Sequence, residues 1–327
     1  MRFATILLLG MLAFAAHAAE PATLKLTQTI ALPGVQGRFD HFAIDVKGRR
    51  LFVAALGNNT LEVIDLAAGK RIQSVAGMSK PTGILYLPDS NHILVANGDD
   101  GTLKILDGGN FKTIKNLTAL EDADNLRFDP KTKLAWLGYG EGALGIIDAS
   151  AAKEVARVPL PKHPESFQLE PDGNRIFVNV PDAKQVAVID RDKRSIVATW
   201  PMEKFQANFP MALDGTNRRL FIGCRKPARL VVLDTSTGKP VADMAISGDI
   251  DDLFYDVTRR RLYLSCGEGF IDIIDQRSAD TYQLRERIPT RTGARTAFFS
   301  KDLNEFYLAV PQRGNQEAEL RAFQTQP

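Results

Sequence analysis

The chain has 327 residues, of which 41 are Lys or Arg and 39 are Asp or Glu, so its formal net charge at pH 7 is only +2. This balance gives no general attraction to polyanions and therefore does not favour a nucleic-acid-binding protein. The length alone would indicate about two domains, but propellers and barrels of this size fold as single units. The internal repeats must therefore decide the fold class.

Residues 1–18 have the pattern of a secretory signal peptide. Arg2 precedes an apolar run from Phe3 to Ala16, and the small residues Ala16 and Ala18 flank His17. This run is shorter than the roughly 20 apolar residues that a spanning helix needs. We expect cleavage after Ala18, no membrane-spanning segment in residues 19–327, and a periplasmic or secreted protein. Loss of Arg2 lowers the formal net charge from +2 to +1.

From residue 24 onward, short apolar runs recur with a period near 42 residues. LKLTQTIAL at residues 24–32 comes first, and seven groups of three runs follow, beginning with HFAID, RRLFV and LEVID. Runs similar to VID close the third run of six groups, with steps of 42, 41, 42, 44 and 41 residues; they end at Asp65, Asp107, Asp148, Asp190, Asp234 and Asp275. Such short runs, separated by Gly, Asp, Asn and Pro, are typical of four-stranded propeller blades.

The two ends of the chain complement each other. Six groups are followed by a fourth, amphipathic run, such as KRIQSV at residues 70–75, whereas the seventh group is followed by none. We therefore predict an all-β fold with one domain over residues 19–327, a seven-bladed β-propeller of four-stranded antiparallel blades. Residues 24–32 would supply the outermost strand of the last blade and so remove the free sheet edges. A linear solenoid would instead need capping repeats at both ends.

The stretch LFVAALGNNTLEVIDLAAGKRIQSV at residues 51–75 resembles the YVTN-type β-propeller repeat proteins, the group that includes periplasmic YncE-like propellers. The resemblance extends over residues 19–327, although the tetrapeptide has become FVAA, LVAN and FVNV. Members of this group are exported or surface propellers, often without an assigned reaction, and related seven-bladed propellers include lactonases and lyases. The resemblance therefore implies the fold and export, and leaves binding and catalysis open.

The first strand of each blade should be innermost, so its beginning should lie at one mouth of the central channel. Alignment of the seven first strands brings to one level Asp40, Thr82, Asp124, Glu165, Phe209, Asp251 and Arg295. Neighbouring polar positions are Arg38, His41, Lys80, Asp122, Asn125, His163, Asn208, Asp249 and Asp252. We call these residues the collar.

Repeat symmetry can bring collar residues from different blades to one small site. We predict that Asp40, His41, Asp124, Glu165, Asp251 and Arg295 bind a small polar ligand or a divalent cation. The cation is the only cofactor that the sequence suggests. The alternative is that these residues are solvated turn residues, because Asp and Asn commonly cap turns through side-chain hydrogen bonds to the backbone.

Other site types have little support. After residue 18 the histidines are His41, His92 and His163, which does not favour a multi-histidine transition-metal centre. The sequence has no Cys-x-x-Cys-His haem motif and no Gly-x-Ser-x-Gly elbow, and GYGEGALG at residues 138–145 reads as a turn between strands. Aromatic residues on strand positions are expected to form the core between blades; they are Trp136, Phe177, Phe221 and Tyr263.

Cys224 and Cys266 should lie two residues past the second strands of adjacent blades, on the collar face. Equivalent positions diverge from the axis, so we expect two separate thiols, with a disulfide as the alternative. Arg259, Arg260 and Arg261 fall in a turn between first and second strands. We interpret them as part of a solvated, locally paired rim rather than a DNA-binding face.

These observations favour an exported, monomeric, non-enzymatic propeller. Its collar would bind a small polar ligand, a cation or another exported protein. The alternative is a metal-assisted lactonase or lyase in which collar carboxylates hold a divalent ion and His41 or His163 moves protons.

Overall fold

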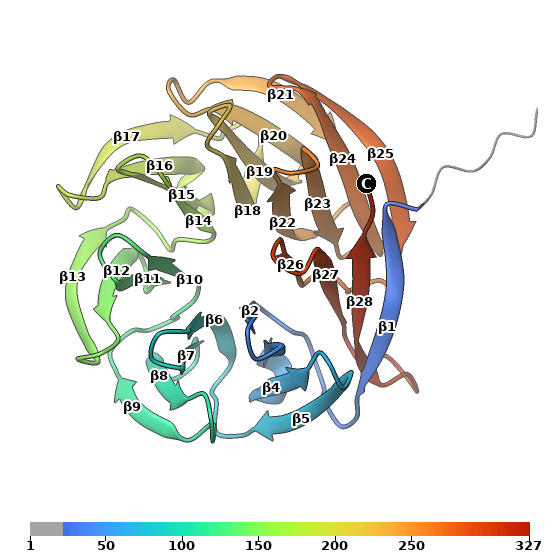
Figure 1. Ribbon diagram of the computed structural model, residues 1–327. Coiled ribbons are helices and arrows are strands. Elements are labelled where there is room, and N and C mark those ends of the chain that lie inside the picture. Colours follow the sequence, from blue (N-terminus) through green and yellow to red (C-terminus); the bar gives the residue numbers. More distant parts are fainter. Residues whose placement is uncertain (1–21) are drawn as a thin grey trace, which may run out of the picture.

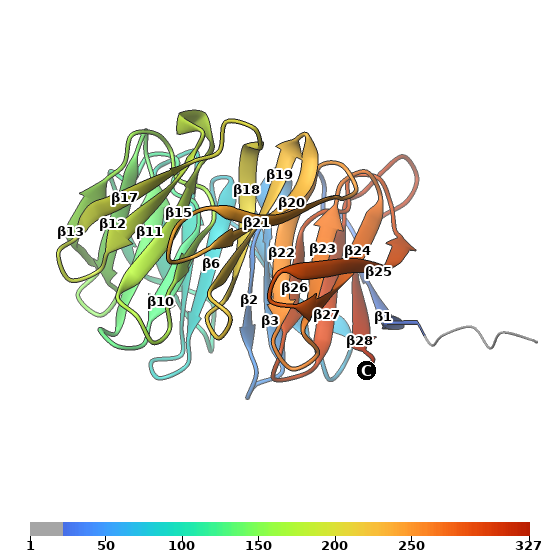
Figure 2. The ribbon, with the colours of Figure 1, turned by 90° about the horizontal axis from the view of Figure 1, so that it is seen from above.

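The computed structural model describes residues 22–327, which form a ring of seven four-stranded antiparallel sheets around a central channel (Figure 1). The strands run between the two faces of a disc (Figure 2). The helical segments of residues 22–327 are two short 3-10 turns, η1 (Leu56–Asn58) and η2 (Pro181–Ala183). No helix in this part of the chain is long and apolar enough to cross a membrane. The predicted seven-bladed propeller is confirmed, whereas the predicted signal peptide lies outside the described residues.

Each blade is a meander whose first strand is innermost. Blades 1 to 4 are β2 (Phe42–Asp45), β3 (Arg50–Ala55), β4 (Thr60–Asp65), β5 (Lys70–Val75); β6 (Pro81–Leu87), β7 (His92–Asn97), β8 (Thr102–Asp107), β9 (Thr113–Leu117); β10 (Leu126–Asp129), β11 (Leu134–Tyr139), β12 (Ala143–Asp148), β13 (Lys153–Pro159); and β14 (Phe167–Leu169), β15 (Arg175–Val180), β16 (Gln185–Asp190), β17 (Ser195–Pro201). Blades 5 to 7 are β18 (Gln206–Asp214), β19 (Arg219–Lys226), β20 (Ala228–Asp234), β21 (Pro240–Ala245); β22 (Ile250–Asp256), β23 (Arg261–Cys266), β24 (Phe270–Ser278), β25 (Thr281–Pro289); and β26 (Ala297–Ser300), β27 (Glu305–Val310), β28 (Ala318–Thr325) with β1 (Leu24–Leu32).

The N-terminal strand closes the ring. β1 pairs antiparallel with β28, from Leu24 opposite Thr325 to Leu32 opposite Ala318. The two strands, the first and last of the chain, lie side by side at the outer edge of blade 7 (Figures 1 and 2). The prediction that residues 24–32 complete the last blade is therefore confirmed.

The hydrophobic core is divided among the contacts between neighbouring blades. The seven core clusters each join residues from two adjacent blades. The predicted inter-blade aromatic residues are confirmed, because Trp136, Phe177, Phe221 and Tyr263 are all buried. β1 contributes to two of these contacts, through Ile30 and Leu32 toward blade 1 and through Leu24 toward blade 6. The closing strand therefore stabilises the packing on both sides of the last blade.

The aspartates of the VID-like runs have a local structural role. In five blades the carboxylate accepts hydrogen bonds from the backbone N–H groups two and three residues later, as Asp65 does from Ala67 and Ala68. The same pattern occurs at Asp107, Asp148, Asp190 and Asp234. This is the hydrogen bonding of an Asx turn, which begins the connection to the fourth strand.

Two details of the sequence prediction need correction. Cys224 lies inside β19 and Cys266 is the last residue of β23, so neither follows its strand. Both are free thiols, in agreement with the predicted pair of separate thiols; both are also fully buried, and burial raises the pKa of Cys224 to about 12. Arg261 is the first residue of β23 rather than part of the turn, and it is buried against Asp275 at 2.9 Å. Arg259 pairs locally with Asp256, which agrees with a paired rim.

Shortening a buried side chain of the closing strand β1 should destabilise the whole ring. Leu32 is 0% exposed whereas Leu26, on the same strand, is 50% exposed. We expect Leu32→Ala to lower the free energy of unfolding by about 2–5 kcal/mol and Leu26→Ala by about 0.5 kcal/mol or less, in urea denaturation followed by circular dichroism. Equal losses in the two variants would contradict a closing role for β1.

Candidate functional site

Three of the aligned collar residues, Asp40, Asp124 and Glu165, share one level, as the alignment predicts. The backbone N–H groups of Asp40, Asp124 and Glu165 each donate a hydrogen bond of 2.9 Å to a carbonyl of the second strand in their own blade. The acceptors, Ala54, Gly138 and Asn179, occupy equivalent positions in three blades. Asp251 lies near the start of β22, and Arg295 lies just before β26. Because the backbone is fixed in this way, the side chains of different blades meet around the channel.

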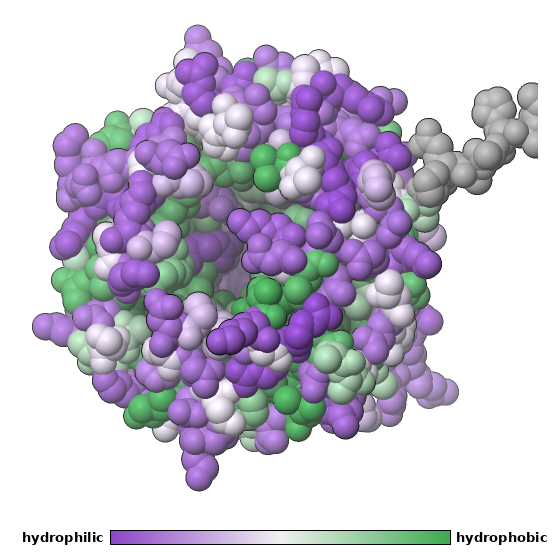
Figure 3. Space-filling view, in the orientation of Figure 1, coloured by the Kyte–Doolittle hydropathy of each residue, from purple (hydrophilic) through white to green (hydrophobic). Residues whose placement is uncertain are grey.

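The channel mouth leads into a cavity of about 590 Å³. All six predicted ligand-binding residues line it, and a space-filling view shows the hollow at the centre of the ring (Figure 3). Two other collar residues do not line it. Asn208 is buried and donates hydrogen bonds to Asn179 and to the Gln185 carbonyl. Asp249 is 42% exposed and pairs with Arg295. The cavity volume of about 590 Å³ is within the usual range for small-molecule pockets.

Nine charged or titratable side chains at the channel mouth form two groups. The histidine–carboxylate cluster consists of Asp40, His41, Asp124, His163 and Glu165. The arginine–carboxylate cluster consists of Arg225, Asp249, Asp251 and Arg295. The sequence predicts one common site, whereas the contacts divide its residues between these two clusters.

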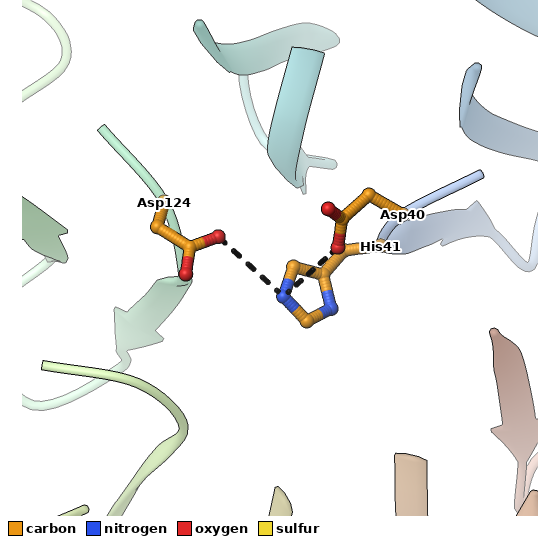
Figure 4. A group of neighbouring side chains, drawn as sticks. All are labelled: Asp40, His41 and Asp124. Carbon is orange, nitrogen blue, oxygen red and sulfur yellow. Dashed lines mark ion pairs between the residues drawn. The ribbon is translucent and has the colours of Figure 1, made fainter. Parts of the chain in front are cut away.

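Asp124 is the centre of the histidine–carboxylate cluster. Its Oδ1 lies 3.8 Å from His41 Nε2, and its Oδ2 lies 3.9 Å from His163 Nε2. His41 Nε2 is also 3.6 Å from Asp40 Oδ1 (Figure 4). Two sets of possible metal ligands therefore share Asp124, one with Asp40 and His41 and one with His163 and Glu165, and within each set the ligand atoms lie within 4.8 Å of one another. The convergence of two histidines on one carboxylate was not predicted.

Small residues in blade 2 allow this convergence. Asp124 belongs to blade 3 and His41 to blade 1, so the start of the intervening blade must not fill the space between them. Thr82 Oγ1 donates a hydrogen bond of 2.6 Å to the Ala123 carbonyl. A Cβ added at Gly83 would lie 2.0 Å from the Asp124 carbonyl oxygen, so a larger residue would displace this segment. Thr82 and Gly83 thus hold the Asp124 segment close over blade 2.

His163 is oriented by the backbone. Its Nδ1 lies 2.7 Å from the Gly140 carbonyl oxygen, which requires that Nδ1 carry the proton and donate. Gly140 has φ of +64°, a conformation that glycine adopts readily. The other nitrogen, Nε2, consequently faces Asp124. In metal sites, the ring of a histidine ligand is commonly fixed by a hydrogen bond from its other N–H group to a backbone carbonyl, a carboxylate or water.

Burial and mutual repulsion change the acidities of the cluster. Burial, reinforced by the charges of Asp124 and Asp251, raises the pKa of Asp40 well above its usual value. Burial and the charge of Asp124 likewise raise the pKa of Glu165 to about 8. Burial would also raise the pKa of Asp124, but the interactions with His163 and His41 outweigh it and lower this pKa. At neutral pH, Asp124 is therefore ionised and Glu165 mostly holds its proton, while the raised pKa of Asp40 favours its protonated form.

The two histidines differ in charge for related reasons. Burial lowers the pKa of His41 below its usual value of 6.5, so this ring is neutral at pH 7. Burial also opposes protonation of His163, but its interaction with Asp124 and its hydrogen bond to Gly140 raise the pKa to about 9. A neutral and a protonated imidazole thus flank one carboxylate.

The arginine–carboxylate cluster is internally balanced. Arg225 donates to an Asp251 oxygen, and its Nε donates to the Ile250 carbonyl at 2.7 Å. Arg295 Nε lies 3.2 Å from the second Asp251 oxygen, and Arg295 Nη1 lies 2.6 Å from Asp249 Oδ1. Two guanidinium groups therefore neutralise Asp251, which belongs to neither set of metal ligands among residues 22–327.

Arg225 also lines the cavity beside the collar, and the sequence prediction missed it because it comes from a second strand. Its guanidinium lies over the Phe209 ring, 4.1 Å from the centroid. A signal for it exists in the repeats, since the other six blades carry an uncharged residue at the same position: Leu56, Gly98, Gly140, Pro181, Gly267 and Pro311. Alignment of second strands, and not of first strands alone, would have found it.

The fold and this mouth define the class of protein as a seven-bladed β-propeller with a charged collar at its central channel. No protein-family model matches the chain. The YncE proteins of Salmonella typhi and Salmonella typhimurium, both described as uncharacterized, are each 23% identical to it, over 94% of this chain and 77% of theirs. The chain is thus a seven-bladed propeller that is similar to YncE over most of its length.

Other similarities concern the fold alone. THO complex subunit 3 of Arabidopsis thaliana is 25% identical over 134 residues, which is 41% of this chain and 42% of that protein. A chain in the crystal structure of the mitotic checkpoint complex superposes with a TM-score of 0.77 at 14% identity, covering 100% of this chain and 99% of that one. A chain of Kuenenia stuttgartiensis hydrazine synthase gives 0.73 at 16% identity, covering 85% and 95%.

The link between His163 and Asp124 predicts a pH dependence for the metal-free protein. A raised histidine pKa contributes stability that is fully present below 6.5 and is lost as the pH rises through about 9. NMR titration should place His163 near this value and His41 below 6.5. In Asp124→Asn, the His163 pKa should fall by more than one unit and the loss of stability at alkaline pH should become smaller.

The control is Asp89→Asn, since Asp89 is 88% exposed in the turn between β6 and β7. This variant should leave the His163 titration unchanged. A wild-type His163 that titrates at the usual value, or one that Asp124→Asn does not shift, would contradict the proposed pairing.

Proposed function

We propose that this protein is an exported propeller that binds a divalent cation at its histidine–carboxylate cluster and a small polar ligand in the adjoining cavity. The observation that carries the proposal is the position of Asp124, His163 and Glu165, whose ligand atoms lie within 4.8 Å of one another. The pattern of residues 1–18 supports export.

The ligand set favours a transition metal or zinc. One imidazole nitrogen and two carboxylates suit Zn²⁺ or Mn²⁺, whereas Ca²⁺ and Mg²⁺ prefer oxygen ligands alone. His163 is the better oriented of the two histidines, because its Nδ1 is already engaged with the Gly140 carbonyl and its Nε2 faces Asp124. His163, Asp124 and Glu165 are therefore the proposed ligands.

The electrostatics of the cluster also favour a cation. Burial and neighbouring negative charge raise the pKa of Glu165 and of Asp40, and so favour the protonated form of each carboxyl group. A divalent ion would oppose the same repulsion and take the place of these protons. The arginine–carboxylate cluster has no such imbalance, because Asp251 already contacts Arg225 and Arg295. The site for a cation is thus on the histidine side of the collar.

Zinc alone is a sufficient probe of this proposal. Zn²⁺ should raise the melting temperature of the wild type, since a ligand at about 100 times its Kd stabilises by about 2.7 kcal/mol. Calorimetric titration at neutral pH in two buffers should show proton release, because Glu165 and His163 must lose their protons. Asp124→Asn should abolish both effects while the control Asp89→Asn keeps them. Absence of binding to the wild type, or equal binding to Asp124→Asn, would refute the cation site.

One observation favours a second candidate, a metal-assisted lactonase or lyase. His41 is neutral at pH 7 and lies on the side of Asp124 opposite His163, where it can accept a proton. In lactone hydrolysis, water would attack the carbonyl carbon while His41 accepts its proton. The ring C–O bond would then break, and the proton would pass to the leaving alkoxide.

This candidate is tested with the zinc-loaded protein and δ-valerolactone. If the protein is a lactonase, the wild type should hydrolyse the lactone, and His41→Gln should lower kcat by about 10²-fold or more without loss of zinc. Zinc binding by a wild type that does not hydrolyse this lactone would support the binding function and count against the lactonase.

A further inference from the structure

Seven residues form a second ring in the channel, further along the first strands than the collar. Its members are three residues after the aligned collar positions, and each pairs with the same position of a second strand; they are Ala43, Leu85, Arg127, Gln168, Ala212, Phe254 and Phe298. Five of the seven are apolar. Arg127 is the one charged member, and Gln168 in the next blade is the one uncharged polar member. All except Ala212 line the cavity.

Arg127 has few protein partners for a residue in this position. Its Nη1 donates to the Leu126 carbonyl at 2.8 Å, and its guanidinium lies over the Phe167 ring at 5.6 Å from the centroid. Among residues 22–327 it forms no ion pair within 4.0 Å, whereas Arg225 and Arg295 each contact two carboxylates. An arginine has five N–H donors, so most of those of Arg127 are available to a molecule in the cavity.

The nearest acidic groups do not occupy these donors. Asp252 accepts a hydrogen bond of 2.7 Å from the Ala297 backbone N–H. Burial and the charge of Asp251 raise the pKa of Asp252 to about 8, so this side chain carries a proton at pH 7. Asp124 is engaged with the two histidines. Gln168 uses its amide nitrogen to donate to the Met211 carbonyl at 3.0 Å. The positive charge of Arg127 therefore faces the cavity without a matching anion.

We propose that Arg127 binds the carboxylate of a small organic acid whose apolar part lies against Phe254 and Phe298. A guanidinium forms two parallel hydrogen bonds with a carboxylate, and such charge-assisted pairs are strong when shielded from water. The two phenylalanine rings are 6.2 Å apart and form an apolar wall on the opposite side of the ring of strands. A monoanion fits better than phosphate, because ionised Asp124 would repel additional negative charge.

This inference deepens the binding role proposed above and rests on it for the location of the ligand in the channel, but it does not require the cation. The two ideas involve different residues, Arg127 for the carboxylate and the histidine–carboxylate cluster for the metal. They can therefore fail separately.

The test is calorimetric titration of metal-free protein with phenylacetate, and with phenylacetamide as its uncharged counterpart. Phenylacetate should bind the wild type, and phenylacetamide should bind at least about tenfold more weakly, a difference of about 1.4 kcal/mol. Arg127→Gln should weaken phenylacetate binding about 10- to 100-fold. Arg127→Lys, which keeps the charge but loses the paired donors, should show a smaller loss. The matched control is Lys193→Gln, because Lys193 is 72% exposed in a turn on the opposite face and its loss should change nothing.

Several outcomes would overturn the inference. These are equal binding of phenylacetate and phenylacetamide, unchanged binding by Arg127→Gln, no phenylacetate binding up to roughly 10 mM, or binding of inorganic phosphate in preference to phenylacetate. If Arg127→Gln does not fold, the comparison of Arg127→Lys with Lys193→Gln decides. Asp124→Asn should lose zinc and keep phenylacetate, whereas Arg127→Gln should lose phenylacetate and keep zinc, so a failure of the metal site is distinguishable from a failure of this one.

Discussion

The structure depends on one constraint: each blade is apolar on both faces and can bury them only between two neighbours. The seven core clusters lie at the seven contacts between blades, so a chain of blades with free ends would expose two such faces. The pairing of β1 with β28 removes both ends at once, since β1 packs toward blade 1 and toward blade 6. The channel, its collar and the spacing of the site residues all follow from this closed ring.

Within the ring, charge is distributed unevenly around the channel mouth. On one side Arg225 and Arg295 neutralise Asp249 and Asp251. On the other side buried carboxylates adjoin two histidines, and burial together with neighbouring negative charge raises the pKa of two of them, Asp40 and Glu165, although Arg38 lies 3.7 Å from Asp40. The first side is a completed ion-pair network. The second side carries an unfavourable concentration of acidic groups. The fold tolerates it because the hydrophobic core that stabilises the ring lies between the blades and not at the channel mouth.

Most of the fold, and part of the site, could be predicted from the sequence. The period near 42 residues and the missing fourth run of the last group were sufficient for the blade number and for closure by residues 24–32. The level of Asp40, Asp124 and Glu165 followed from the same register. How closely these side chains approach one another around the channel could not be predicted, because the approach depends on the space that Thr82 and Gly83 leave in blade 2. Arg225 was missed because it comes from a second strand, and Arg127 because the alignment considered the channel mouth rather than the next ring below it.

The backbone hydrogen bonds at the collar have a consequence for how such a protein can change over evolution. The N–H groups of Asp40, Asp124 and Glu165 are held by carbonyls of the neighbouring strand, whatever side chain each residue carries. The equivalent positions already include a threonine, a phenylalanine and an arginine, namely Thr82, Phe209 and Arg295. At positions held by the backbone in this way, a point mutation can alter the chemistry of the channel without displacing the scaffold. Divergence of ligand preference among propellers of this architecture can therefore proceed one repeat at a time.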